Sequence, residues 1–243
     1  MMKNFSQSRS SFHFAAVSLV VLLGAIMAPA QQHNTATEIQ QVDAAVKARV
    51  ESIAGYTVTE HYAVYRNNDE THPAAEMTVK TTYLEDTGKS YNIVSQSGSS
   101  LIRNLVLGSI LDNEKRLNDP GIRDETWITS ANYQMKLEPG GTQPMDGRDC
   151  LVLALTPRRK APYLLQGKLW VDAKDGSIVQ VEGTASKSSS FLTGPTQILR
   201  RYANVGGFPE ATRARAVSNS FMFGQTVVTI DYLNYQVQLR PPV

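Results

Sequence analysis

Residues 167–183 read GKLWVDAKDGSIVQVEG, and this stretch decides the fold class. Residues that favour strands lie on both sides of the polar turn AKDG. A connection this short predicts a hairpin of two antiparallel strands, 165–172 and 177–186. The few charged side chains of the stretch form no pattern typical of a catalytic site.

The same pattern continues along most of the chain. Turn-rich segments such as TPRRKAP and VGGFP separate the stretches that favour strands. After Trp127 no helix is predicted between these stretches. Consecutive strands with short connections form an antiparallel meander, not a parallel sheet. The predicted strands are 56–66, 76–85, 89–96, 133–138, 148–156, 165–172, 177–186, 197–205, 210–221 and 225–237. Alternation in the first strand places on one face Tyr56, Val58, Glu60, Tyr62 and Val64.

A first helix is predicted before these strands. Thr37 can cap it, and Gln40 stands three residues later in the capping-box position. The helix ends near Gly55. Its apolar residues recur at steps of three and four and predict a face that packs on something apolar: Ile39, Val42, Val46, Val50 and Ile53.

A second helix is predicted in the segment 100–117. SLIRNLVLGSIL carries seven large aliphatic residues between Leu101 and Leu111, which cover most of a helical wheel. Gly108 inside it costs about 1 kcal/mol of helix propensity. Two interpretations follow: a helix buried in the core, or a lid whose apolar face covers a cavity and can loosen.

Together these elements predict a mainly β (α+β) fold. About ten strands and two helices imply a strongly curved antiparallel sheet that wraps around the helices. Residues 31–243 have the length of one such domain.

The first 30 residues have the features of a signal peptide. Lys3 and Arg9 precede the apolar run 14–27, and Ala28 and Ala30 form a small-residue cleavage pattern. The alternative is an uncleaved anchor, but the run is shorter than the roughly 20 apolar residues that a spanning helix needs. We therefore expect export to the periplasm with cleavage after Ala30. The junction has no Cys, so the chain is not expected to be a lipoprotein itself.

Charge argues against a nucleic-acid partner. Lys3 and Arg9 are two of the 24 basic residues, and residues 1–30 hold none of the 22 acidic ones, so 31–243 carries 22 of each. No basic field remains to hold a nucleic acid or an anionic membrane by charge alone. The lone Cys150, in DCLVLAL, is interpreted as a small buried hydrophobe.

The sequence shows no pattern of a catalytic or metal site. His33, His61 and His72 have no neighbours at ligand spacing, and GxSxG, HExxH and P-loop motifs are missing. DAKDG lacks the ligand spacing of a calcium loop. We therefore expect a protein that binds and is not an enzyme, with no cofactor.

The order of several loose motifs resembles the outer-membrane lipoprotein-sorting (LolA-like) family over about residues 37–238. The resemblance is densest over 146–175, where DGR, a strand ending in TPRRK, and GKLWVDAKDG follow one another. Tyr202 followed by Gly206, Gly207, Phe208 and Pro209 gives a shortened version of a Gly-x-x-hydrophobic-Pro step in the family.

The resemblance implies an open β-barrel around an apolar cavity, with helices as a lid and no catalytic residues. The implied ligands are the acyl chains of a lipoprotein or a related lipid, carried across the periplasm by a monomer. Sorting components of the inner and outer membranes are the implied protein partners. The candidate cavity and lid residues are Leu101, Leu105, Ile110, Leu169, Trp170, Val179, Val181 and Tyr202.

Three other functions remain open. A non-catalytic envelope sensor could use the same fold to detect misplaced lipoprotein. A scaffold would have a filled barrel without a cavity. A hydrolase would need polar side chains clustered on one sheet face.

Overall fold

The computed structural model describes residues 34–188, 195–220 and 224–241. The predicted signal segment 1–30 lies outside the described residues. No helix in these ranges combines the length and the apolar character that a membrane span requires.

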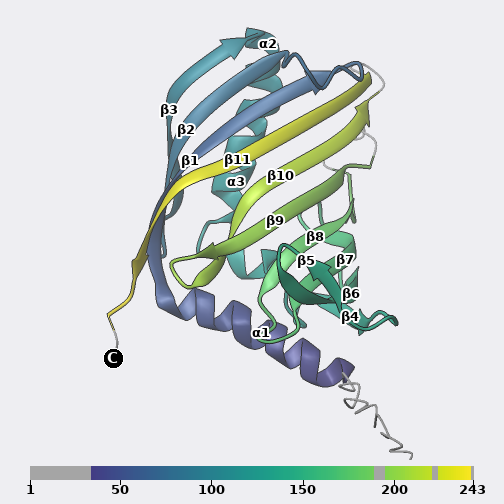
Figure 1. Cartoon of the computed structure of the whole chain (residues 1–243). Helices are drawn as coiled ribbons and strands as arrows, with labels where there is room; N and C mark the ends of the chain where they lie inside the picture. The colour runs from purple at the N-terminus through teal and green to yellow at the C-terminus, as the bar shows by residue number, and fades with distance from the viewer. Residues whose placement is uncertain (1–33, 189–194, 221–223, 242–243) are drawn as a thin grey trace, which may run out of the picture. The chain divides into compact units, whose positions relative to one another are not determined.

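The described residues form one antiparallel sheet of eleven strands, in the order β3-β2-β1-β11-β10-β9-β8-β7-β6-β4, with β5 paired to β6 (Figure 1). The order ends at β3 and β4, so the sheet is open, and the predicted fold class is confirmed. The ten predicted strands are present, and the short β5 was missed. The bounds are β1 Ile53–Arg66, β2 Ala75–Leu84, β3 Gly88–Gly98, β4 Tyr133–Leu137, β5 Gln143–Met145, β6 Arg148–Pro157, β7 Leu165–Asp172, β8 Ile178–Ala185, β9 Gln197–Val205, β10 Phe208–Ser220 and β11 Gly224–Leu239.

The hairpin from which the fold class was predicted is formed by β7 and β8. Gly167 lies opposite Gly183 in this pair. A Cβ atom on Gly167 would lie only 2.1 Å from the carbonyl oxygen of Glu182, so this close approach of the two strands requires glycine.

Helix α1 spans Thr35–Ser52 and leads directly into β1. Its N-cap is Asn34, whose side chain accepts a hydrogen bond from the Ala36 amide at 3.0 Å. The prediction that Thr37 caps the helix was wrong, because Asn34 is also a good cap and starts the helix one turn earlier. Val42 is buried on the face that was predicted to pack.

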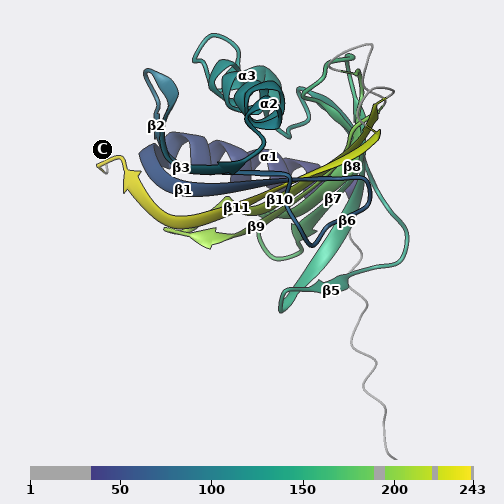
Figure 2. The same ribbon diagram turned by 90° about the horizontal axis from the view of Figure 1, so that it is seen from above.

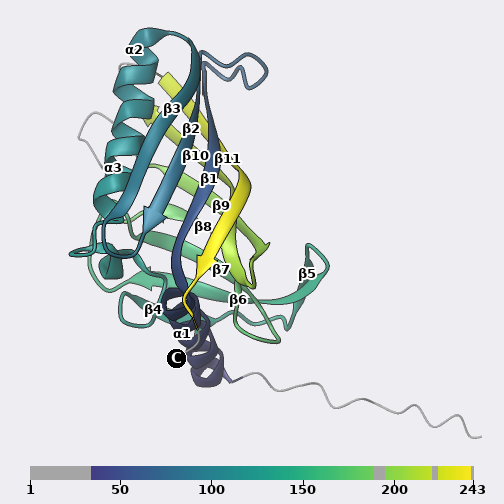
Figure 3. The same cartoon turned by 90° about the vertical axis from the view of Figure 1, so that its left-hand side faces the viewer.

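The predicted second helix is continuous but irregular. It comprises α2 Ser100–Ile102, a π-helical turn η1 Arg103–Gly108, and α3 Ser109–Leu117, and we call the whole the 100–117 helix. A short 3₁₀ helix, η2 Arg123–Thr126, follows it. Figures 2 and 3 show the 100–117 helix lying along one face of the sheet.

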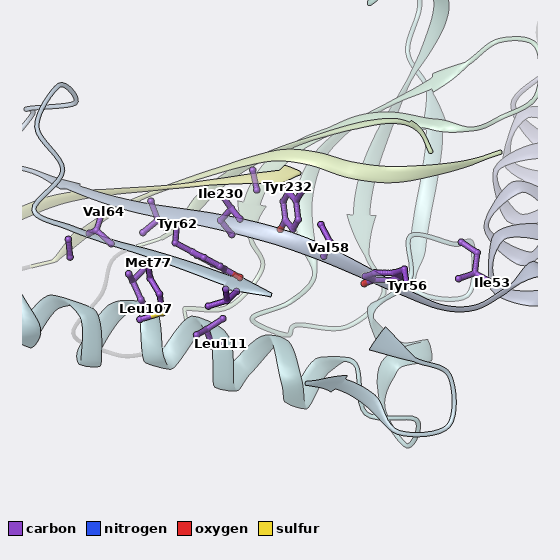
Figure 4. Close-up of a cluster of buried hydrophobic side chains, with 14 residues drawn as sticks. Ile53, Tyr56, Val58, Tyr62, Val64, Met77, Leu107, Leu111, Ile230 and Tyr232 are labelled. Atoms are coloured by element: carbon purple, nitrogen blue, oxygen red, sulfur yellow. The ribbon is translucent and has the colours of Figure 1, made fainter. Parts of the chain in front are cut away.

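Two hydrophobic cores hold the helices to this face. The first core lies between the 100–117 helix and β1, β2, β10 and β11, where Leu107 and Leu111 point toward Tyr62 and Met77 (Figure 4). The second core lies between α1 and strands β4, β6, β7 and β8, with Val42 at its helix side. The 100–117 helix leaves part of its apolar surface uncovered, since Leu101 and Leu105 are 60% and 54% exposed. The helix is therefore not fully buried in the core, and its apolar surface is not fully covered as it would be in a closed lid.

Cys150 is completely buried in β6, as its apolar context predicted. Burial raises the pKa of its thiol, so little reactive thiolate is present at neutral pH. We expect a bulky maleimide to label the native protein much more slowly than the denatured protein, measured by intact mass. Equal labelling rates would show that the thiol is accessible.

Candidate functional site

A cavity of about 360 Å³ lies between α1, α3 and the sheet. Its walls include residues of both hydrophobic cores, such as Ile53 and Tyr56 from the first and Leu165 and Val181 from the second. The volume falls within the range of pockets that bind small molecules.

The lining of this cavity is divided between apolar and charged residues. Aliphatic side chains come mainly from α1, β7, β8 and the start of β9, namely Val46, Val50, Leu165, Ile178, Val181 and Ile198. Charged side chains come from α1, β3, α3, η2, β9 and β10, namely Arg49, Lys89, Glu114, Arg123, Arg200 and Glu210. Tyrosines line the same region as the charges, namely Tyr56, Tyr83, Tyr202, Tyr232 and Tyr235. The cavity therefore differs from the wholly apolar one that the family resemblance implied.

A group of four acidic and basic residues lies at the charged side, and we call it the Lys89 cluster: Glu60, Lys89, Glu114 and Arg200. Lys89 Nζ lies 3.0 Å from Glu114 Oε2 and 3.7 Å from Glu60 Oε1. Arg200 Nη2 lies 3.6 Å from Glu114 Oε1. Tyr62 donates a 2.5 Å hydrogen bond to the other oxygen of Glu60. These contacts tie α3 to strands β1, β3 and β9.

The pKa values of Glu114 and Lys89 are shifted in the directions that favour their charged forms. Lys89 lowers the pKa of Glu114 to about 2, against the opposing effect of burial. Burial lowers the pKa of Lys89, but the negative charges of Glu114 and Glu60 outweigh it and leave that pKa well above its usual value. The Lys89–Glu114 ion pair is thus charged in a poorly hydrated place.

A second ion pair joins α1 to the sheet. Arg49 donates from Nε and Nη2 to the two carboxylate oxygens of Glu210, each at 2.8 Å. Glu210 is buried, so this two-bond geometry is a strong, oriented contact. It fixes the distance between α1 and β10 at one wall of the cavity.

Arg123 lies in η2 after the 100–117 helix. Its Nη1 donates to the Tyr83 hydroxyl at 3.1 Å and to the Glu85 carbonyl at 2.5 Å. Tyr83 and Glu85 lie at the C-terminal end of β2, so Arg123 holds the segment after α3 to the end of this strand.

The structure brings two of the predicted site residues, Val181 and Tyr202, to the cavity wall. Leu169 and Val179 are fully buried, and Leu169 belongs to the second core. Ile110 packs on the first core. Trp170 donates its indole N–H to Gln143 at 3.4 Å, and Leu101 and Leu105 are exposed. None of these six residues lines the cavity.

The charged residues were missed in the sequence. A signal existed for Glu60, which shares the buried face of β1 with Tyr56, Val58, Tyr62 and Val64. A carboxylate in such a row needs a buried partner. No comparable signal existed for Lys89, Glu114 and Arg200. They are far apart in the sequence, and the residues around each one do not indicate that the three side chains come into contact.

The histidines of the described residues lie away from the cavity. His61 Nδ1 lies 3.1 Å from the Thr78 hydroxyl, and His72 pairs with Asp69 in an exposed loop. Within the described ranges, no three His, Cys, Asp or Glu residues are grouped so that they could hold a metal ion.

No family model matches the sequence, and no curated protein matches it. Several solved structures are similar in fold. A LolA superfamily protein from Nitrosomonas europaea is 13% identical with a TM-score of 0.45, over 86% of this chain and 96% of that one. A domain proposed to be an outer membrane lipoprotein-sorting protein, from Vibrio parahaemolyticus, is 13% identical with a TM-score of 0.49, over 84% and 94%. A DUF1329 family protein from Desulfovibrio piger is 15% identical with a TM-score of 0.40, over 82% and 92%. At these identities and scores, the likenesses assign neither a ligand nor a partner to this chain.

Proposed function

We propose that this chain is an exported carrier that binds the acyl part of a lipoprotein or a related lipid and moves it toward the outer membrane. The observation that supports the proposal most directly is the cavity of about 360 Å³ between the helices and the sheet, with one aliphatic side. A scaffold with a filled barrel would lack this space.

The aliphatic side gives the cavity its affinity for a lipid chain. Each CH₂ group that leaves water contributes about 0.8 kcal/mol. Val46, Ile178 and Val181 offer such a surface on α1 and β8. A modest apolar wall suits a carrier, because a ligand that is held too tightly would not be released.

Binding without catalysis fits the charged side of the cavity. Glu210 is engaged by Arg49 through two hydrogen bonds, and Glu114 is engaged by Lys89. The pKa of Glu114 is about 2, so this carboxyl does not hold a proton to donate near neutral pH. We propose that these groups shape the cavity and hold the helices.

A titration tests the proposal. Delipidated protein is mixed with a fluorescent single-chain acyl probe below its micelle concentration, and the probe signal is followed to saturation. Saturable binding to one site is expected, and so is faster transfer of the probe between donor and acceptor vesicles. Binding without accelerated transfer would favour a sensor, and no binding would favour a scaffold.

We also propose that the protein acts in the periplasm after removal of residues 1–30. Intact mass of the protein recovered from the periplasm should correspond to a chain that begins at Gln31. A mass that includes Met1 would contradict the proposed export and cleavage.

A further inference from the structure

The charges that line the cavity are unequal in number. In the described part of the chain, four cationic side chains but only two carboxylates line it: Arg49, Lys89, Arg123 and Arg200 against Glu114 and Glu210. Glu60 and Glu85 do not line the cavity, but they lie 3.7 Å from Lys89 and 3.9 Å from Arg123, so the charges balance and an incoming anion depends on a cation that still has free donors.

The two carboxylates are already engaged by other cations. Glu210 forms both of its short hydrogen bonds with Arg49, and Glu114 accepts a 3.0 Å hydrogen bond from Lys89. Their repulsion of an incoming anion is therefore largely offset.

Two cations of the lining, Arg123 and Arg200, have a buried Nε without a hydrogen-bond partner among the described residues, and Arg123 already donates from Nη1 to Tyr83 and Glu85, so Arg200 is the less engaged of the two. Its contact with Glu114 is 3.6 Å, longer than a hydrogen bond, and its buried Nε has no hydrogen-bond partner among the described residues. The side chain is 35% exposed and lines the cavity. Arg200 also forms a side-chain hydrogen bond with Tyr202, but its Nε is left without a partner, which is costly in such a place, and a carboxylate or phosphate can satisfy two arginine donors together.

The position of Arg200 in the sheet suits the head group of an amphiphile. It lies opposite Val181 of β8 on one side and the small Ala214 of β10 on the other. The aliphatic wall thus begins at the strand next to Arg200. Tyr202 and Tyr232 also line the cavity and add hydroxyl donors.

From this arrangement we propose that the cavity selects amphiphiles with an acidic head group, a carboxylate or a phosphate, and that Arg200 binds that group. The chain of the ligand lies toward Val181 and Ile178. This inference rests on the proposed carrier function and adds the chemical class of the ligand.

The test compares three probes with the same fluorescent alkyl chain: a fatty acid, an alkyl phosphate and an uncharged glycerol ester. The unmodified protein should bind one or both acidic probes about tenfold more tightly than the ester, as expected for a charged hydrogen bond. The stronger of the two acidic probes identifies the head group.

Three variants assign the preference to Arg200. Arg200→Gln should bring the affinity for the acidic probes down to that of the ester and leave the ester unchanged, and Arg200→Lys should keep part of the preference. Arg201→Gln is the matched control, because Arg201 is the next residue of β9, is exposed and does not line the cavity.

Each other outcome is decisive. Equal affinity of the unmodified protein for all three probes would overturn the inference and leave the carrier function intact, a result that needs no variant to fold. An equal loss for acidic and neutral probes in Arg200→Gln would overturn the role of Arg200. Failure of all three probes to bind would overturn the carrier function itself.

Discussion

A Lys89→Met variant is expected to lose about 3–5 kcal/mol of unfolding free energy, the usual cost of removing one partner from a buried ion pair. Lys89 is the cation closest to both Glu60 and Glu114, and the Glu60 side chain is only 3% exposed. Without Lys89, Glu60 keeps the Tyr62 hydroxyl, but no other cation among the described residues forms an ion pair with it. Denaturant unfolding of the two proteins at pH 7 measures the loss.

Lys80→Met is the matched control for this variant. Lys80 is exposed on β2, so its replacement should change the unfolding free energy by less than about 0.5 kcal/mol. A loss below about 1 kcal/mol in Lys89→Met would show that the Lys89 cluster is solvated and contributes little.

The effect of pH on this loss follows from Glu114. Its pKa is lowered from 4.5 to about 2 in the folded protein, so its contribution to stability is present above pH 4.5 and is lost as the pH falls through about 2. Because Lys89 is the main cause of the shift, the variant lacks most of this contribution. The difference in stability between the two proteins should therefore shrink as the pH falls from 5 toward 2.

Leu107→Glu is expected to have the second large effect, a loss of several kcal/mol or complete unfolding. Leu107 is fully buried in the first core, where a carboxylate would have no counter-charge. Leu105→Glu is the control, since Leu105 lies in the same π-helical turn but is 54% exposed. Its denaturant midpoint and its affinity for an acyl probe should stay close to those of the unmodified protein.

This pair of variants also tests how the 100–117 helix is used. If Leu105→Glu folds normally but loses the acyl probe, Leu105 reaches the ligand in a closed state of a lid, as the sequence had suggested. Equal destabilisation by Leu105→Glu and Leu107→Glu would contradict the observed orientation of the helix.

Local patterns explain why the sheet could be predicted from the sequence. Alternation and turn residues act over a few positions, so strands such as 165–172 and 197–205 were predicted with the bounds that the structure has. β5 was missed because three residues around Pro144 give no alternation to detect. The start of α1 was misplaced because Asn34 and Thr37 are both suitable caps.

Tertiary contacts explain why the site could not be predicted as well. The apolar arc of the 100–117 helix is wider than the part of the sheet that covers it. The composition of the helix therefore could not predict that Leu101 and Leu105 would be exposed to solvent. The Lys89 cluster unites β1, β3, α3 and β9, and its members meet because the sheet curves around α3. Only Val181 and Tyr202 of the predicted site residues line the cavity; Val179 lies on the same strand as Val181 but is fully buried away from the cavity, and its position in the sequence does not show this.

The most direct test of the carrier function is a substitution that fills the cavity with a larger side chain from α1. Ala45 of α1 lines the cavity, whereas Ala48, one turn further along, is exposed. Both variants, Ala45→Phe and Ala48→Phe, are titrated with the fluorescent acyl probe after their denaturant midpoints have been shown to be similar. Ala45→Phe should lower the affinity about tenfold or more, equivalent to about 1.4 kcal/mol, and Ala48→Phe should leave it unchanged. Unchanged binding by a folded Ala45→Phe would contradict the assignment of this cavity as the acyl site.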